Sequence, residues 1–175
     1  MKMMKLQVLQ FHKLIIACSA GFILMLSACQ PLYTSPNGDV GASNTALSLI
    51  SVAHVDTRSG QQVRNRLIFL LSNGTTPLNP TFELRIRVSS NASTSASRID
   101  ATGKTAGIVL TTVSYELYDI SKKNIVYRGT RSASASYDQT SQSFANERAK
   151  RDAENRSAKA VAEQIRFAIA ADLNN

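Results

Sequence analysis

Apolar and polar residues alternate along three stretches of the chain, and each alternation predicts a β-strand. From Phe82 to Ser89 every even-numbered residue is apolar and every odd-numbered residue is polar, which is typical of a strand with one buried and one solvated face. The same period of two recurs from Val109 to Leu117 and from Ile125 to Asp138. The polar segment from Asp119 to Asn124 predicts a turn, so these stretches indicate an antiparallel meander.

Two other stretches have helical spacing. The first is bounded by a capping box at Ser59–Gln62 and a left-handed stop at Asn73-Gly74, and Val63, Leu67 and Leu71 lie on one face between them. A longer helix is predicted from Phe144 to Leu173. Its solvent side carries acid-before-base pairs, Glu147/Arg151 and Asp152/Arg156. Its inner stripe is predicted to consist of Ala145, Ala149, Ala153, Val161, Ile165 and Ile169.

The remaining segments complete an α+β fold. Imperfect alternation from Thr45 to Val55 predicts a first strand with a bulge, and the helix after it favours a right-handed parallel crossover. The serine-rich segment from Ser89 to Gly107 lies between two well-patterned strands, which predicts that they extend into a projecting hairpin. The expected fold is a two-layer sandwich of order β-α-β-β-β-α, with two helices packed on one face of a four-stranded mixed sheet.

The first 28 residues have the pattern of an export signal. Three lysines precede the uncharged run from Leu14 to Met25, and about 12 helical residues span about 18 Å, less than the ~30 Å hydrocarbon core. The run is therefore expected to be a signal-peptide core rather than a transmembrane helix. We expect a signal peptide over residues 1–28, a turn-rich tether over 29–44 and one folded domain over 45–175.

The signal ends in Leu26-Ser27-Ala28-Cys29, which resembles the lipobox of bacterial lipoproteins. The resemblance implies cleavage before Cys29, an S-diacylglycerol on its sulfur and an N-acyl chain such as palmitate on its amino group. Several acyl chains anchor a protein stably, whereas one chain gives marginal binding. Gln30 resembles the residue that follows the cysteine in lipoproteins sent to the outer membrane, so a lipid anchor on its periplasmic face is expected. An ordinary secretory signal with an incidental cysteine is the alternative.

Net charge limits the classes of binding partner, and the cysteine content limits how the fold can be crosslinked. The chain carries 20 Lys and Arg against 12 Asp and Glu, and loss of the signal leaves 17 basic residues and a net charge of +5. An exported protein of this charge meets anionic lipid and acidic sugar, and no nucleic acid. Cys18 leaves with the signal and Cys29 is acylated, so no disulfide is available and packing alone must hold the fold.

The sequence contains few groups of residues that could form a catalytic site. His54 is the one histidine after the signal, and its position two residues before Asp56 fits a structural pair on a strand better than a catalytic one. One histidine without a free cysteine does not favour a zinc site. No serine lies in a nucleophile elbow, and Glu83, Glu116 and Asp119 form no recognisable carboxylate pair. We therefore predict no enzyme, no metal and no cofactor beyond the covalent lipid.

With no catalytic or metal site predicted, binding by shape and charge is the class of function that remains. The outer face of the sheet carries Arg85, Arg87 and many Ser and Thr side chains, so it either meets water or docks on another polar surface. Each further cation alone is most often a solvated surface charge, but none lies in an obvious acid pair, which leaves them available for phosphates. These cations are Arg98 and Lys104 in the hairpin, and Arg128, Arg131, Arg148 and Lys150 in the last strand and last helix.

Short motifs in order along the chain resemble one family. Cys29-Gln30-Pro31-Leu32-Tyr33 is similar to the start of the mature alphaproteobacterial lipoproteins of the LPS-assembly LptE family. That family folds as two helices on a four-stranded mixed sheet. The resemblance continues through Arg64-Asn65-Arg66-Leu67, Tyr115–Asp119, Phe144–Ala149, Arg151–Glu154 and Val161–Ile165.

The resemblance implies a function, partners and contact residues. LptE proteins plug the outer-membrane β-barrel LptD and help it insert lipopolysaccharide into the outer leaflet, and a polar anchored domain suits a polar barrel lumen. Members also bind lipopolysaccharide through basic residues. The hairpin position matches Arg98, with Lys104 as a further candidate, and the helical position falls near Asn146, with Arg148 as the nearest cation. These side chains would bind lipid A phosphates through charge-assisted hydrogen bonds.

Two other functions remain open. A stand-alone envelope-stabilising lipoprotein would bind peptidoglycan or anionic lipid and would purify without a barrel. A lipoprotein hydrolase would lose its activity when a single serine or histidine is changed.

Overall fold

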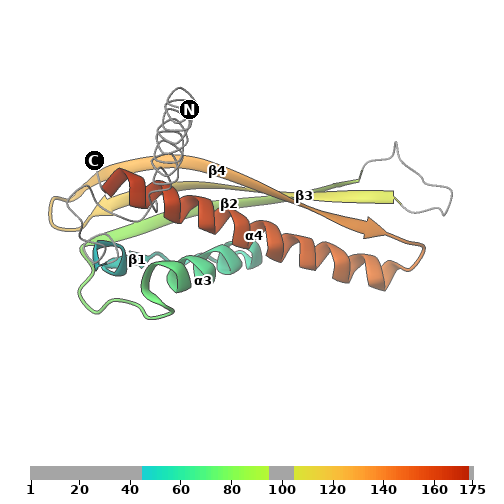
Figure 1. The fold of residues 1–175 in the computed structure, drawn as a ribbon, viewed down its shortest axis with the longest axis horizontal. Coiled ribbons are helices and arrows are strands. Elements are labelled where there is room, and N and C mark those ends of the chain that lie inside the picture. Colours follow the sequence, from blue (N-terminus) through green and yellow to red (C-terminus); the bar gives the residue numbers. More distant parts are fainter. Residues whose placement is uncertain (1–44, 95–104, 174–175) are drawn as a thin grey trace, which may run out of the picture. The chain divides into compact units, whose positions relative to one another are not determined.

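The computed structural model describes residues 45–94 and 105–173. The strands form one sheet in the order β1-β2-β3-β4, in which β1 pairs parallel with β2 and the other pairs are antiparallel. The predicted α+β sandwich with a mixed sheet is confirmed, and the serine-rich segment contributes the end of β2, up to Thr94, and the start of β3, from Thr105 (Figure 1). The elements are β1 (Ile50–Val52), α3 (Arg58–Ser72), β2 (Phe82–Thr94), β3 (Thr105–Asp119), β4 (Asn124–Gln139) and α4 (Ser143–Leu173).

Both helices pack on one face of the sheet. The predicted alternation holds, because Leu84, Val113 and Leu117 are fully buried on this face. They form one apolar cluster with Val63 and Leu67 of α3 and with residues of α4. Burying a side chain of this size contributes about 1.5–3 kcal/mol, so this cluster holds the two layers together.

Helix α4 contacts the sheet through a stripe of small and branched side chains. Val161, Ile165 and Ile169 are fully buried, as predicted. Ala145 is exposed and Ala149 is half-buried, so the predicted stripe is wrong at its first position. The reason is that the N-terminal half of α4 packs against a second, smaller cluster, which does not extend to the first turn. The buried residues of that cluster are Val109, Ala135, Tyr137 and Ala153.

The solvent side of α4 carries the predicted ion pairs. Arg151 Nε lies 3.1 Å from Glu147 Oε1, and Arg156 Nε lies 2.7 Å from Asp152 Oδ2. Exposed pairs of this kind contribute only about 0.3–0.5 kcal/mol each. Arg156 also donates from Nη2 to the carbonyl oxygen of Ser136 at 2.7 Å, which ties α4 to the outermost strand, β4.

A layer of hydroxyl groups separates the two apolar clusters. Thr111 of β3 and Ser157 of α4 are fully buried, and their Oγ atoms lie 2.7 Å apart. Ser90 Oγ lies 3.2 Å from Thr111 Oγ1, and Ser157 also donates to the carbonyl oxygen of Glu154 at 3.0 Å. A buried polar group without a partner costs about 1–3 kcal/mol, so these mutual bonds make the layer compatible with the core.

The first strand is shorter than predicted. Of Thr45–Val55, only Ile50–Val52 pairs with β2, and residues 45–48 form a helical turn instead. After Val52, Arg64 Nε donates to the carbonyl oxygens of that residue and the next, at 3.3 and 3.1 Å. Local hydrogen bonds from side chains compete with a strand ladder, and alternation alone does not reveal them.

Helix α3 begins before the predicted capping box. Thr57 is the N-cap, and its Oγ1 accepts a hydrogen bond from Gly60 N at 3.2 Å. Gly60 is buried against Val55, where a Cβ would lie 2.5 Å from Val55 Cγ1. Ser59 therefore lies inside the first turn and is not the cap. The predicted left-handed stop is confirmed, because Asn73 has a φ of 52°.

The β3–β4 turn is built around the carboxylate of Asp119. Its Oδ1 accepts hydrogen bonds from the backbone N–H groups of Lys122 and Ser121, both at 2.9 Å, and from Ser121 Oγ at 2.7 Å. Donation from Lys122 N–H, followed by donation from Ser121, holds the pKa of Asp119 below its ordinary value. The charged form of Asp119 therefore stabilises this turn.

We expect this carboxylate to make stability fall in acid. Because folding lowers the pKa of Asp119, its contribution to stability is fully present above about pH 3.9, which is the ordinary pKa of an aspartate in an unfolded chain. That contribution is lost as pH falls through the lower folded pKa. Asp119→Asn should be less stable than the parent at neutral pH and should lose less stability between about pH 4 and 2. Thermal unfolding by circular dichroism measures both, and parallel pH curves for the two proteins would contradict this role.

Candidate functional site

The sheet face opposite the helices is exposed and mostly polar. Hydroxyl groups face one another across its strands: Thr112 Oγ1 lies 3.0 Å from Ser132 Oγ, and Ser114 Oγ lies 3.3 Å from Thr130 Oγ1. Such a face presents donors and acceptors in regular rows. We call it the open face; its polar residues are Glu83, Arg85, Arg87, Ser89, Asn91, Thr112, Ser114, Glu116, Arg128, Thr130, Ser132 and Ser134.

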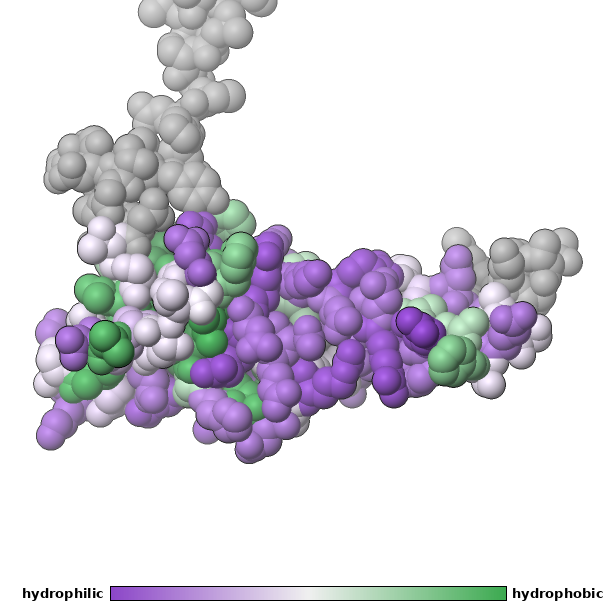
Figure 2. Space-filling view, turned by 90° about the horizontal axis from the view of Figure 1, so that it is seen from below, coloured by the Kyte–Doolittle hydropathy of each residue, from purple (hydrophilic) through white to green (hydrophobic). Residues whose placement is uncertain are grey.

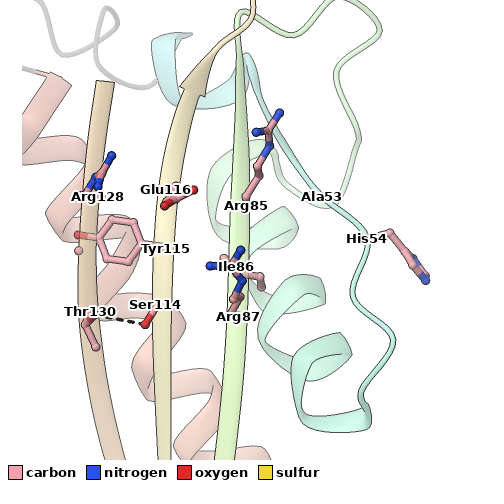
Figure 3. Close-up of a pocket in the computed structure, with 11 residues that line it drawn as sticks. Ala53, His54, Arg85, Ile86, Arg87, Ser114, Tyr115, Glu116, Arg128 and Thr130 are labelled. Atoms are coloured by element: carbon pink, nitrogen blue, oxygen red, sulfur yellow. Dashed lines mark hydrogen bonds between the residues drawn. The ribbon is translucent and has the colours of Figure 1, made fainter. Parts of the chain in front are cut away.

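A groove of about 420 Å³ lies at the end of the open face nearest to β1 (Figure 3). Arg85 in this groove is already engaged, because its Nε lies 2.7 Å from Glu83 Oε2. Its guanidinium also stacks 4.2 Å from the centre of the Tyr118 ring. The polar residues that line the groove are His54, Arg85, Arg87, Ser114, Tyr115, Glu116, Arg128 and Thr130.

Arg87 and Arg128 are the available cations of this groove. Both are exposed, and within residues 45–94 and 105–173 neither side chain has a hydrogen bond or an ion pair. The register places Arg128 opposite Glu116, and Arg87 opposite Ser114 one row further along. A guanidinium beside hydroxyl groups suits phosphate or carboxylate oxygens, which it binds through charge-assisted and often bidentate hydrogen bonds.

His54 also lines the groove, but its side chain does not join the arginines (Figure 3). It lies in the connection between β1 and α3, because the strand predicted to carry it ends at Val52. Its Nε2 is 3.2 Å from Asp56 Oδ1, and the two side chains are 75% and 96% exposed. Figure 3 shows the imidazole pointing away from the arginines.

The family model described as LptE: Lipopolysaccharide-assembly matches residues 45–169, which is most of the chain. The chain belongs to the LptE family. It therefore has a role in lipopolysaccharide assembly in the cell envelope, and the family is a non-enzymatic one. No curated protein matches the sequence. Among the described helices, none combines the length and the apolar character needed to cross a membrane.

Solved lipoprotein structures are similar to this LptE-family chain. One, from Caulobacter crescentus CB15, is 21% identical with a TM-score of 0.66, and the match covers 75% of this chain and 94% of that one. A minor lipoprotein from Acinetobacter baumannii is 16% identical with a TM-score of 0.51, over 71% of this chain and 93% of its own. The rare lipoprotein B from Shewanella oneidensis is also 16% identical, with a TM-score of 0.50, over 70% and 92%. At these identities the likeness shows a common fold.

Two of the residues that carry the LptE resemblance serve the fold. Arg64 holds the end of β1, as described above. Asn146 accepts a hydrogen bond on Oδ1 from Thr140 N at 2.7 Å and donates from Nδ2 to the carbonyl oxygen of Thr140 at 2.6 Å. The helical position near which the resemblance implied a lipid contact is therefore occupied by a side chain that joins β4 to α4.

The structure does not bring the predicted contact Arg148 to the open face. Its side chain is exposed on α4, with the guanidinium 5.7 Å from the centre of the Phe144 ring. It lines a separate groove with Arg58 and Arg151. The other predicted sites, Cys29, Arg98 and Lys104, lie outside the described residues.

Sequence patterning did not predict that Arg87 and Arg128 line one groove. Both lie in the outward phase of their strands, which is a usable signal. Bringing them together, however, requires the register of β2 and β4 on β3, and that register places Arg128 opposite Glu116 and Arg87 opposite Ser114.

Proposed function

We propose that this LptE-family protein is an outer-membrane lipoprotein held by acyl chains on Cys29. The domain plugs the lumen of the LptD barrel, assists its assembly and the insertion of lipopolysaccharide into the outer leaflet, and catalyses no reaction. The lipobox supports the anchor, and membership of the lipopolysaccharide-assembly family supports the task.

The open face is the observation that carries the plug proposal. Its rows of hydroxyl and charged groups are exposed over the length of three strands, and the interior of a large outer-membrane barrel is polar and water-filled. Hydroxyl groups exchange hydrogen bonds with water for hydrogen bonds with lumen side chains at a small net change in free energy. Such a face can therefore dock in a polar lumen and is also compatible with water when it is alone, although it exposes Ile108 and Leu110 among its polar rows.

Affinity purification of the acylated chain from solubilised outer membranes tests the plug. We expect a large β-barrel protein to co-purify, as identified by mass spectrometry. Ser132→Arg, which adds bulk in the middle of the open face, should reduce the amount of barrel recovered. Gln164→Arg makes a comparable change at an exposed position of α4 and should not. Recovery of the chain alone, or with peptidoglycan, would instead favour a stand-alone envelope-stabilising lipoprotein.

We further propose that lipopolysaccharide phosphates bind the basic side chains of the open-face groove. A hydrogen bond to a charged group contributes about 1.5–3 kcal/mol. Replacing Arg87 and Arg128 together with alanine should therefore weaken lipopolysaccharide binding by about tenfold or more. The remaining binding should depend less on salt, because exposed charges are the ones that salt screens.

Three further variants compare this groove with the other candidate contacts. Arg98→Ala combined with Lys104→Ala tests the hairpin, Arg148→Ala tests the helix, and Lys159→Ala removes an exposed cation elsewhere on α4 as the matched control. Isothermal titration with lipopolysaccharide at low and high ionic strength measures each affinity. A groove variant that binds like the Lys159→Ala control would contradict the phosphate role of Arg87 and Arg128.

A further inference from the structure

Exposed apolar side chains gather at one end of the described domain. This end holds the last turns of α3 and α4, the start of β2 and the β3–β4 turn (Figure 1). Figure 2 shows several apolar residues there in green, at the left. We call the six residues concerned the apolar end, and they are six of the nine large apolar side chains that are exposed in the described chain: Leu49, Phe69, Leu78, Ile120, Ile125 and Phe167.

Backbone hydrogen bonds bring the segments of this end together. Thr81 N donates to the carbonyl oxygen of Leu49 at 3.0 Å, and Ile120 N donates to the carbonyl oxygen of Thr81 at 3.1 Å. Leu78, in the loop before β2, is 97% exposed. Single exposed apolar residues are ordinary, whereas a group of them on adjoining segments marks an interaction surface.

The exposed charged residues of the β3–β4 turn at this end are lysines, because Asp119 is buried. Lys122 and Lys123 are exposed; Lys122 Nζ lies 3.7 Å from Asp119 Oδ2, and Lys123 has no ion pair within the described residues. The neighbouring segments 45–50 and 73–81 contain no charged residue. Apolar side chains flanked by lysines are suited to the interface of an anionic bilayer, where the apolar groups enter the headgroup layer and the ammonium groups contact phosphates.

The chain enters the described domain at this same end. Thr45 precedes β1 by five residues, and 16 positions separate it from Cys29. Even fully extended, that length spans at most about 55 Å. An anchor on Cys29 would therefore tether the domain by the end that holds Thr45.

We propose that the apolar end rests on a phospholipid surface, with Leu78, Ile120 and Ile125 in the headgroup layer and Lys123 beside the lipid phosphates. This inference rests on the proposed acyl anchor.

Site-specific fluorescence on the acylated full chain tests the contact. With the signal removed and Cys29 acylated, an introduced cysteine is the one free thiol, so it can carry an environment-sensitive dye. Leu78→Cys reports on the apolar end, and Ser134→Cys, exposed on the open face, is the matched control. Each labelled protein is reconstituted in vesicles of phosphatidylethanolamine and phosphatidylglycerol that contain a brominated phospholipid quencher. Flotation first establishes that the protein is bound to the vesicles.

We expect the dye at position 78 to shift to the blue and lose most of its fluorescence, while the dye at position 134 keeps its fluorescence. A protein that floats with an unquenched dye at position 78 would overturn this inference but not the proposed anchor. That is the result expected on vesicles without a barrel protein if the apolar end contacts such a protein and not lipid. Quenching at position 134 without quenching at 78 would also overturn it. A chain that does not float would overturn the proposed anchor, and this inference with it.

Discussion

Ile165→Ala is expected to lower the free energy of unfolding by about 2–5 kcal/mol. Ile165 lies in the C-terminal half of α4 and is fully buried in the main apolar cluster, where it packs with residues of α3 and the sheet. The substitution removes buried surface and leaves a cavity where both helices meet the sheet. No disulfide is expected to compensate for the lost packing.

Urea unfolding followed by circular dichroism measures this effect. Phe144→Ala on the same helix is the matched control, because its side chain is larger but 74% exposed. Surface substitutions of this kind usually change stability by no more than about 0.5 kcal/mol. Equal losses in the two variants would mean that α4 is not held by its buried stripe.

Gly129→Ala is expected to destabilise the protein by about 1–3 kcal/mol, although it adds one methyl group. The ring of Tyr115 crosses from β3 over Gly129 of β4, and a Cβ at position 129 would lie 2.6 Å from Tyr115 Oη and 2.7 Å from Cζ. Tyr115 is only 3% exposed, so its ring has little room to move. Gly107 under the ring of Tyr137 repeats this arrangement with the strands exchanged.

A double-mutant cycle separates this clash from a general loss of strand stability. Gly129→Ala combined with Tyr115→Val should cost less than the sum of the two single substitutions, because the shortened side chain makes room for the methyl group. Thr130→Ala, next in the chain but exposed on the open face, should cost about 0.5 kcal/mol or less. Strict additivity of the two substitutions would show that the ring does not exclude the Cβ.

Most of the fold could be predicted from local patterns. Alternation identified the inner and outer faces correctly, because burial of Leu84, Val113 and Leu117 on one side of the sheet is what a period of two encodes. The left-handed stop at Asn73 was predictable because few residues adopt that backbone conformation. The parallel crossover followed from chain connectivity.

The rest depended on contacts between segments far apart in the sequence. The end of β1 is held by Arg64, which lies 12 residues further along, and no local pattern encodes that bond. The groove needs the relative register of three strands, because Arg87 and Arg128 face different rows. The exposure of Ala145 follows from where the smaller cluster ends, which helical periodicity does not specify.

The long edge strand β4 affects how copies of this protein would behave if the proposed anchor crowded them on a membrane. β4 is a 16-residue edge of the sheet, and unprotected edges of this length invite strand addition between chains and aggregation. Two of its carbonyl oxygens already accept hydrogen bonds from guanidinium groups, Ser136 from Arg156 and Thr130 from Arg131. These arginines make continuous pairing with a second copy less favourable, so the proposed anchor could concentrate copies of the chain on a membrane without polymerisation through their sheets.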